Sequence, residues 1–452
     1  MLTLIRDTET IALLDPERRE IRGGWVLVGG GTIVAVGEPG REPSEGIDRI
    51  VRAEGMVLLP GLVNTHHHLY QTLTRAYPGA TDVELFDWLR ALYPVWARID
   101  RTGIQAAARC GIAELLLSGC TTTSDHHYLF GPACPDPIDA TVEAAAELGI
   151  RFHATRGSMS LSEKDGGLPP DRVVQRADRI LEDSRRIVER YHDPRPGAML
   201  RIALAPCSPF SVDRELMIET ARLAEALDVR LHTHLAETKD EERYCLERHG
   251  MRPLDLLEEL EWLGDRTWIV HGIHFNTEEI ARLGKARCGI THCPSSNMRL
   301  GSGIAPTLDL VAAGCPYGIG VDGSASNDSS SLIGEVRQAL LLGRIRYGPA
   351  RLVADEVLRW ATRGGAAVLG RDDIGRIAPG MRADLALFSL DALPFSGAGD
   401  PIAALPLCGA SRVHTLFVEG RIVVEDGRLL TGDERTIIRD HREAARRIRE
   451  ND

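Results

Sequence analysis

Residues 56–69 read MVLLPGLVNTHHHL, an apolar run that leads directly into three consecutive histidines. On an extended strand the side chains alternate between two faces, so His66 and His68 point to one side and His67 to the other. Two imidazoles at this spacing on a strand end can bind one metal ion together. Taken alone, the three histidines are also consistent with a polar strand end of structural origin.

The middle of the chain alternates short apolar segments with amphipathic or alanine-rich stretches. Eight strands alternating with helices predict an α/β fold with a parallel (β/α)8 TIM-type barrel, which we place at residues 58–375. Helical stretches between the strands include residues 102–118, 137–149, 171–191 and 213–227. The expected strands lie near residues 58–65, 120–125, 151–156, 201–206, 229–235, 267–272, 287–292 and 317–322.

The two ends of the chain differ from the middle. Strand-like runs with glycine-marked turns occur in residues 21–37 and again in residues 383–424. We therefore expect a small β-sandwich domain built from both chain termini, residues 1–57 plus 376–432. The arginine- and glutamate-rich residues 433–452 predict a solvated C-terminal helix.

Composition excludes several classes of partner. The chain has 53 basic and 65 acidic residues, a net charge of −12 and no basic block, so neither nucleic acid nor an acidic membrane surface is an expected partner. No apolar stretch approaches the roughly 20 residues of a membrane helix. The nine cysteines are scattered without a CxxC pair, and the N-terminus shows no secretory signal, so we expect reduced thiols and a cytoplasmic location.

Acidic and imidazole side chains stand at several strand ends, which is where the chemistry of a (β/α)8 barrel lies. The fifth expected strand ends at His234, with Glu237 three residues later; the sixth ends at His271 and the eighth at Asp322. One such histidine would more often be structural. Four strand ends that carry histidine or aspartate indicate a metal site, and this ligand set suits Zn²⁺, with Fe²⁺ as the alternative.

Several longer motifs follow one another along the chain. They are PGLVNTHHH (60–68), HLAE (234–237), VHGIH (270–274), THCPSSN (291–297), GVDG (320–323) and GRIAPGMRADL (375–385). In this combination the chain resembles the amidohydrolase superfamily, in its mononuclear cyclic-amidine deaminase branch, over nearly its whole length. The resemblance implies a divalent metal ion held by His66, His68, His234 and Asp322. It also implies Glu237, His271 and Asp322 as catalytic residues.

The lysines bear on the number of metal ions. Two-metal members of the superfamily use a carboxylated lysine on the fourth strand as a bridge, and residues 201–207 read RIALAPC. The chain has only Lys164, Lys239 and Lys285, all outside the expected strands. We therefore expect one metal ion and disfavour a ring hydrolase of the dihydropyrimidinase type.

These groups predict hydrolysis of an amidine. A bound metal ion lowers the pKa of water from about 15.7 toward about 7. Asp322 can accept the proton of the attacking water, and His271 can polarise the attacked centre. Glu237 can carry a proton to the ring nitrogen beside the amino-bearing carbon. The alternative for Glu237 is a charge on the protein surface. For His274 we expect a structural or supporting role rather than a catalytic one.

The loop after the first strand bears on the substrate. Relatives that deaminate adenosine-type nucleosides carry an acid two residues before the tryptophan, and this chain has Phe86 two residues before Trp88, which favours a free flat base. Gln71 offers a donor and an acceptor to a purine edge, and Arg156 can hold a ring carbonyl. We take Gln71, Trp88 and Arg156 as candidate substrate contacts. The alternatives are that Gln71 lies on a helix surface and that Arg156 forms a salt bridge within the barrel.

Residues 64–76 and 92–96 are most similar to the 8-oxoguanine deaminases of this branch, which implies conversion of 8-oxoguanine to urate and ammonia. Guanine, isoxanthopterin and aminated s-triazines share the same N=C–NH₂ unit and remain alternatives. A zinc deaminase of the cytidine type would need P-C-x-x-C, and Pro206-Cys207 lacks the second cysteine. A catalytically dead barrel scaffold should have lost metal ligands, and this chain keeps them. Relatives are commonly dimers, so a homodimer is expected.

Overall fold

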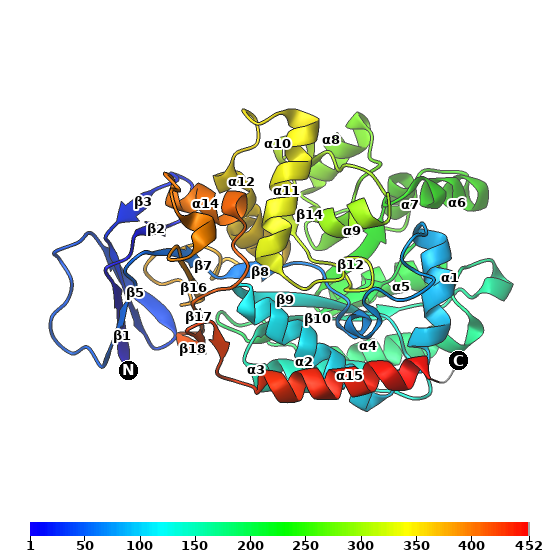
Figure 1. The fold of residues 1–452 in the computed structure, drawn as a ribbon. Coiled ribbons are helices and arrows are strands. Elements are labelled where there is room, and N and C mark those ends of the chain that lie inside the picture. Colours follow the sequence, from blue (N-terminus) through cyan, green and yellow to red (C-terminus); the bar gives the residue numbers. More distant parts are fainter. Residues whose placement is uncertain (451–452) are drawn as a thin grey trace.

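The computed structural model describes residues 1–450, and its centre is a closed barrel of eight parallel strands (Figure 1). Around the barrel the order is β10-β11-β12-β13-β14-β15-β8-β9, so the chain passes once around it. This arrangement confirms the predicted (β/α)8 TIM-type barrel. The strands are β8 (Leu62–Asn64), β9 (Cys120–His127), β10 (Arg151–Ser158), β11 (Leu200–Pro206), β12 (Arg230–Leu235), β13 (Thr267–His271), β14 (Gly289–His292) and β15 (Tyr317–Ile319).

Helices connect the strands and cover the outside of the barrel (Figure 1). None of the described helices is long and apolar enough to cross a membrane. The helical elements are η1 (Leu69–Thr74), α1 (Leu85–Trp96), α2 (Arg101–Leu117), α3 (Pro137–Leu148), η2 (Glu163–Asp165), η3 (Asp171–Val173), α4 (Ala177–Tyr191), α5 (Arg214–Ala226), α6 (Lys239–His249), α7 (Pro253–Glu259), α8 (Thr277–Ala286), α9 (Pro294–Arg299), α10 (Thr307–Ala313), α11 (Leu332–Tyr347), α12 (Ala354–Arg359), the π-helical turn η4 (Trp360–Gly364) and α13 (Gly365–Val368).

Local sequence explains where several of these helices begin and end. Asp100 accepts a hydrogen bond from the backbone N–H of Gly103 and thereby caps α2. Asn276 and Glu279 form a reciprocal capping box at the start of α8. Gly149 ends α3 with a φ of 76°, a left-handed conformation that glycine adopts without steric cost. The expected helix at 171–191 begins only at Ala177. The backbone N–H of Gln175 donates to the Met159 carbonyl and so does not form the helical hydrogen bond that an earlier start would require.

The first expected strand, residues 58–65, divides into two strands that belong to different sheets. Up to Pro60 the chain pairs with Leu385 and its neighbours as β7 (Met56–Pro60), and from Leu62 it pairs with β9 as β8. The switch occurs at Gly61, where a Cβ atom would lie 2.2 Å from the Thr121 hydroxyl oxygen. Only glycine fits this close approach, so the single apolar run in the sequence serves two sheets.

Two antiparallel-rich sheets from both ends of the chain form the small sandwich beside the barrel (Figure 1). Helix α15 lies along α2 and η1, with Ile437, Ala444 and Ile448 buried. The exact domain boundaries stay predictions, and residues 451–452 of the expected terminal helix lie outside the described residues. The sandwich elements are β1 (Leu2–Arg6), β2 (Thr10–Ala12), β3 (Glu20–Arg22), β4 (Trp25–Gly29), β5 (Thr32–Gly37), β6 (Arg49–Arg52), β7, β16 (Leu385–Ser389), β17 (Thr415–Val418), β18 (Arg421–Glu425) and β19 (Arg428–Leu429), followed by α15 (Glu434–Arg449); the connecting helices are η5 (Leu393–Phe395) and α14 (Pro401–Cys408).

Candidate active site

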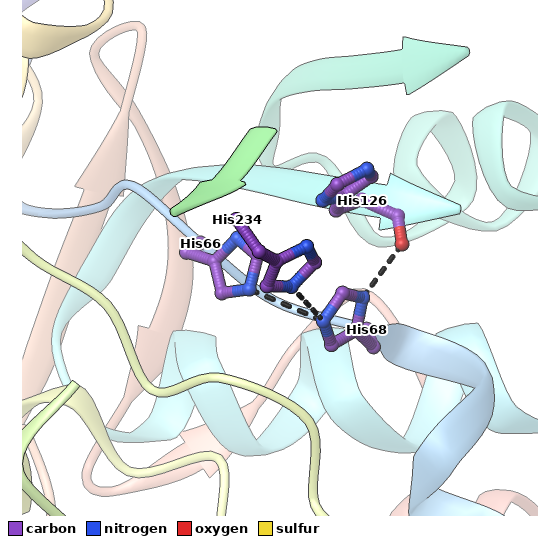
Figure 2. Close-up of side chains that lie close together, drawn as sticks. All are labelled: His66, His68, His126 and His234. Atoms are coloured by element: carbon purple, nitrogen blue, oxygen red, sulfur yellow. Dashed lines mark hydrogen bonds between the residues drawn. The ribbon is translucent and has the colours of Figure 1, made fainter. Parts of the chain in front are cut away.

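Three imidazoles and a carboxylate converge at the C-terminal end of the barrel. His66 Nε2 lies 3.1 Å from His68 Nε2, which lies 3.2 Å from His234 Nε2 (Figure 2). Asp322 Oδ1 completes the group, at 3.3 Å from His66 Nε2 and 3.4 Å from His68 Nε2. The structure thus brings together the four side chains that the sequence suggests as metal ligands.

The hydrogen bonds on the far sides of these rings determine where their protons lie. The Nδ1–H groups of His68 and His234 each donate to a backbone carbonyl at 2.7 Å, those of His126 and Cys207. These two rings therefore present an unprotonated Nε2 to the centre of the group.

His66 reaches the same state through a second imidazole. The Nδ1–H of His232 donates to the Trp268 carbonyl at 2.9 Å, which leaves His232 Nε2 as an acceptor. His66 Nδ1–H donates to that nitrogen at 2.8 Å, so the lone pair of His66 also lies on Nε2 and faces the centre.

The arrangement fits a metal cation. Burial, together with the neighbouring imidazoles, holds the pKa of His66 and His234 well below the ordinary value, so these rings are neutral. For Asp322, burial raises the pKa, but the facing imidazoles, first of all that of His66, outweigh burial and leave the pKa well below normal. Three lone pairs and a carboxylate at these separations repel one another unless a cation lies among them. Nitrogen and oxygen ligands in this number suit Zn²⁺ or Fe²⁺.

Glu237 and His271 lie beside the ligand group, as predicted for catalytic partners. His271 Nε2 lies 3.4 Å from Glu237 Oε2. The Asn297 amide donates to His271 Nδ1 at 3.0 Å, so the proton of this neutral ring is on Nε2 and faces Glu237. Burial, followed by the charges of Asp322 and Glu241, raises the pKa of Glu237 well above the ordinary value. Glu237 is buried, which removes the surface-charge alternative.

Three chain turns at this end of the barrel have unusual backbone conformations. Ala236, His271 and Asp322 have φ angles of 54°, 76° and 63°, in the left-handed region that non-glycine residues seldom adopt. The turn at Ala236 is held by Glu241, whose two carboxylate oxygens each accept a backbone N–H, from Ala236 and Glu237, at 2.8 Å. Strain of this kind persists at sites where neighbouring contacts fix the geometry.

A small cavity of about 30 Å³ opens next to these groups. Gln71 and Trp88, the other two candidate substrate contacts, line it, and Trp88 Nε1–H donates to the Ala325 carbonyl at 3.2 Å. The other lining residues are His68, Leu85, Leu89, Tyr93, Tyr128, Cys207, Ser208, Phe210, His234, Glu237, His271, Leu300, Asp322 and Ser326.

Arg156 is not among the described residues that line this cavity. Its guanidinium donates to Asp183 at 3.0 Å and to the Gln175 side chain at 2.9 Å, and it stacks 3.8 Å over the Phe130 ring. These partners, with the Gly157 carbonyl, bind all three guanidinium nitrogens outside the cavity lining, so the geometry gives no support to a contact between Arg156 and a ring carbonyl. The salt-bridge alternative describes its environment.

Some supporting residues were missed by the sequence reasoning. His232 contacts His66, and the ring of His126 stacks on His234 with centroids 4.8 Å apart (Figure 2). His232 could have been predicted from the alternation of side chains along a strand, since it lies two residues before His234 on the same strand face. His126 has a comparable signal, because it stands near the end of β9. The predicted structural reading of His274 agrees with its bond to the Ser302 carbonyl at 3.0 Å.

Comparison with known proteins identifies the family. The sequence profile of the amidohydrolase family matches residues 57–423. The chain belongs to this family. An 8-oxoguanine deaminase from Pseudomonas aeruginosa is 56% identical over 404 residues, 89% of this chain and 90% of that protein. An isoxanthopterin deaminase from an unknown prokaryotic organism is 37% identical, with 91% and 89% covered.

A solved structure agrees with these relatives. The atrazine chlorohydrolase of Arthrobacter aurescens, crystallised in complex with zinc, matches with a TM-score of 0.94 and 36% identity, covering 98% of this chain and all of that one (100%). The likenesses confirm the amidohydrolase resemblance drawn from the sequence. They also agree with a metal-dependent site.

Proposed function

We propose that this amidohydrolase hydrolyses the 2-amino group of a free purine base, converting 8-oxoguanine and water to urate and ammonia. The observation that carries the proposal is the complete set of converging ligands and acid–base groups at the cavity, in a chain 56% identical to an 8-oxoguanine deaminase. The isoxanthopterin deaminase and the atrazine chlorohydrolase are less similar to this chain, at 37% and 36% identity.

We propose one metal ion, most simply Zn²⁺, with Fe²⁺ as the alternative. His66, His68, His234 and Asp322 would hold it, and when bound it lowers the pKa of a water molecule so that hydroxide is available at neutral pH. Support for a single ion comes from the lysines: Lys164 lies in η2, Lys239 in α6 and Lys285 in α8, so no barrel strand supplies a bridging lysine.

The protein's own groups divide the proton transfers between them. Asp322, ionised because its pKa is low, accepts the proton of the attacking water. Glu237, protonated because its pKa is high, donates to the ring nitrogen beside the amino-bearing carbon. His271 donates from Nε2–H to the oxygen that adds to this carbon. The carbon becomes tetrahedral, its bond to the amino nitrogen breaks, and the proton taken up by Asp322 leaves with ammonia. The proton of the added hydroxyl passes to Glu237, which restores this acid and leaves a carbonyl at the carbon.

The cavity wall supports a free base rather than a nucleoside. Phe86 packs against Phe210, with ring centroids 5.1 Å apart, and Phe210 lines the cavity. An apolar pair therefore stands where a carboxylate would bind ribose hydroxyls. Trp88 and Leu89 add flat apolar surface of the kind that a purine ring packs against.

Ammonia release from purified, metal-replete protein tests the proposal, with 8-oxoguanine, guanine, isoxanthopterin and adenosine measured side by side. We expect the highest kcat/KM for 8-oxoguanine and no turnover of adenosine. A higher kcat/KM for isoxanthopterin or guanine would reassign the substrate within the same chemistry. Preferential turnover of adenosine would contradict the free-base proposal.

A further inference from the structure

The cavity wall contains two buried polar atoms that find no hydrogen-bond partner among residues 1–450. They are Gln71 Oε1 and the Tyr93 hydroxyl. Other polar groups on the same wall are paired; for example, the Ser208 hydroxyl lies 2.7 Å from that of Ser211. Buried polar groups are nearly always hydrogen-bonded. Two such groups that lack a partner and line a cavity therefore indicate where a ligand binds.

The two unpaired atoms serve different parts of the cavity. Gln71 lies against Gly323, since a Cβ atom built there would meet Gln71 Oε1 at 1.8 Å. It therefore stands next to Asp322, beside the reacting groups. Tyr93 belongs to α1 and packs edge-on against Trp96, with ring centroids 5.9 Å apart. Burial raises the pKa of the Tyr93 hydroxyl well above its ordinary value. The smaller contributions come from Cys207 and Tyr70, and none comes from Asp322 or Glu237.

We propose that the Tyr93 hydroxyl donates a hydrogen bond to the C8 carbonyl oxygen of an 8-oxopurine, and so selects such bases over purines without this oxygen. The inference rests on the proposed function, which puts C2 of the base beside Asp322 and Glu237. The five-membered ring then extends away from these groups, and Tyr93 is the remaining wall residue with an unpaired donor. Arg156, which is held by Asp183 and Gln175 and does not line the cavity, does not compete for this role.

The surroundings of Tyr93 make the hydroxyl difficult to explain by packing. The ring contacts Trp96 in the apolar core that includes Leu89 and Leu92, where phenylalanine would fill nearly the same volume. A buried hydroxyl without a partner destabilises the free protein, and at Tyr93, unlike at positions away from the cavity, a bound ligand can supply that partner. Replacement by phenylalanine should therefore leave the free protein equally stable or more stable, while ligand binding weakens.

Binding of urate and xanthine to the wild type and to Tyr93→Phe tests the inference, because these two ligands differ by the C8 oxygen and neither is deaminated. Titration calorimetry should show urate binding weakened roughly tenfold in the variant, the loss expected for one unmade hydrogen bond. Xanthine binding should stay within about twofold, and the melting temperature should not fall. For turnover, kcat/KM should fall for 8-oxoguanine and stay unchanged for guanine.

Tyr317→Phe is a matched control. Tyr317 is also a buried tyrosine with an unpaired hydroxyl, but it packs against Trp360 and does not line the cavity. This variant should bind urate and xanthine as the wild type does.

Three outcomes overturn the inference: equal weakening of urate and xanthine, no weakening of either, or a wild type that binds neither. The proposed function fails separately. A wild type that releases no ammonia from 8-oxoguanine, yet binds urate in a Tyr93-dependent way, would refute the deaminase proposal and support the role of Tyr93.

Discussion

The barrel carries a buried polar cluster at each end, and the two clusters are built in opposite ways. At the N-terminal end, Arg151 places all five of its N–H donors on acceptors: both oxygens of Asp384, one oxygen of Glu419 and the carbonyls of Gly197 and Ala198. At the C-terminal end, three imidazole lone pairs and a carboxylate oxygen face one another.

The difference separates stability from function within one fold. The cluster around Arg151 satisfies itself and joins the barrel to the sandwich, since Asp384 directly precedes β16. The cluster around Asp322 is complete only with a cation, and the wall beside it leaves Gln71 and Tyr93 unpaired. A polar group that is paired within the chain contributes to folding, whereas a buried group left open is available for a ligand.

The largest effect on catalysis is expected for Glu237→Gln at the C-terminal end. The amide keeps the shape but removes the proton that Glu237 donates, so kcat should fall by about 10²–10⁴, the usual contribution of general acid–base catalysis. Ammonia release measures the loss, and elemental analysis should show unchanged metal content. Retention of near-normal kcat would remove Glu237 from the mechanism.

At the N-terminal end, Arg151→Met should give the converse result. It leaves the Asp384 carboxylate buried without its partner, which lowers the free energy of unfolding by about 3–5 kcal/mol. Urea denaturation measures this change, while kcat at 25 °C should be unaffected. In the double variant Arg151→Met/Asp384→Leu the buried charge is gone, so part of the stability should return. A fall in kcat in the folded single variant would contradict the separation of the two clusters.

Removal of the metal ion should lower stability by a smaller amount. A ligand that binds only the native state, present at a hundred times its Kd, stabilises that state by about 2.7 kcal/mol. Chelation should therefore lower the melting temperature, and adding Zn²⁺ back should restore it. In His66→Ala the melting temperature should depend little on chelator. If chelation changes nothing in the wild type, the C-terminal cluster does not need a cation.

The sequence predicts the C-terminal cluster well because its signals are local and topological. Alternation puts His66 and His68 on one strand face, and parallel strands bring His234 and Asp322 to the same barrel end whatever the loops do. Strand ends can therefore be assigned to one site without any knowledge of side-chain packing.

Features that depend on contacts distant in sequence could not be predicted in this way. Arg156 stands at a strand end like the residues that converge at the cavity, but its partner Asp183 comes from α4 and draws its guanidinium away from the cavity. The change of sheet at Gly61 depends on the hydroxyl of Thr121, which lies 60 residues later in the chain. The unpaired state of the Tyr93 hydroxyl is likewise visible only once its neighbours are in place.

The smallest of these effects, and the sharpest test of the comparison, is expected for His232→Phe. Among the proposed metal ligands, His232 hydrogen-bonds to His66, whose Nδ1–H it accepts at 2.8 Å while its own Nδ1–H is fixed on the Trp268 carbonyl. Phenylalanine keeps the ring but removes the acceptor that orients His66, and the loss of such a supporting contact typically weakens metal binding by about 10–100-fold. Competition with a chromophoric chelator measures the Zn²⁺ affinity directly.

His153→Phe is the control. His153 is also a buried barrel imidazole, but its charged neighbours are Arg371, Arg201 and Arg230. Its loss should therefore alter stability and leave the Zn²⁺ affinity unchanged. Equal Zn²⁺ affinities in the two variants would mean that the orientation of His66 does not depend on His232, and that the metal ion alone aligns its ligands.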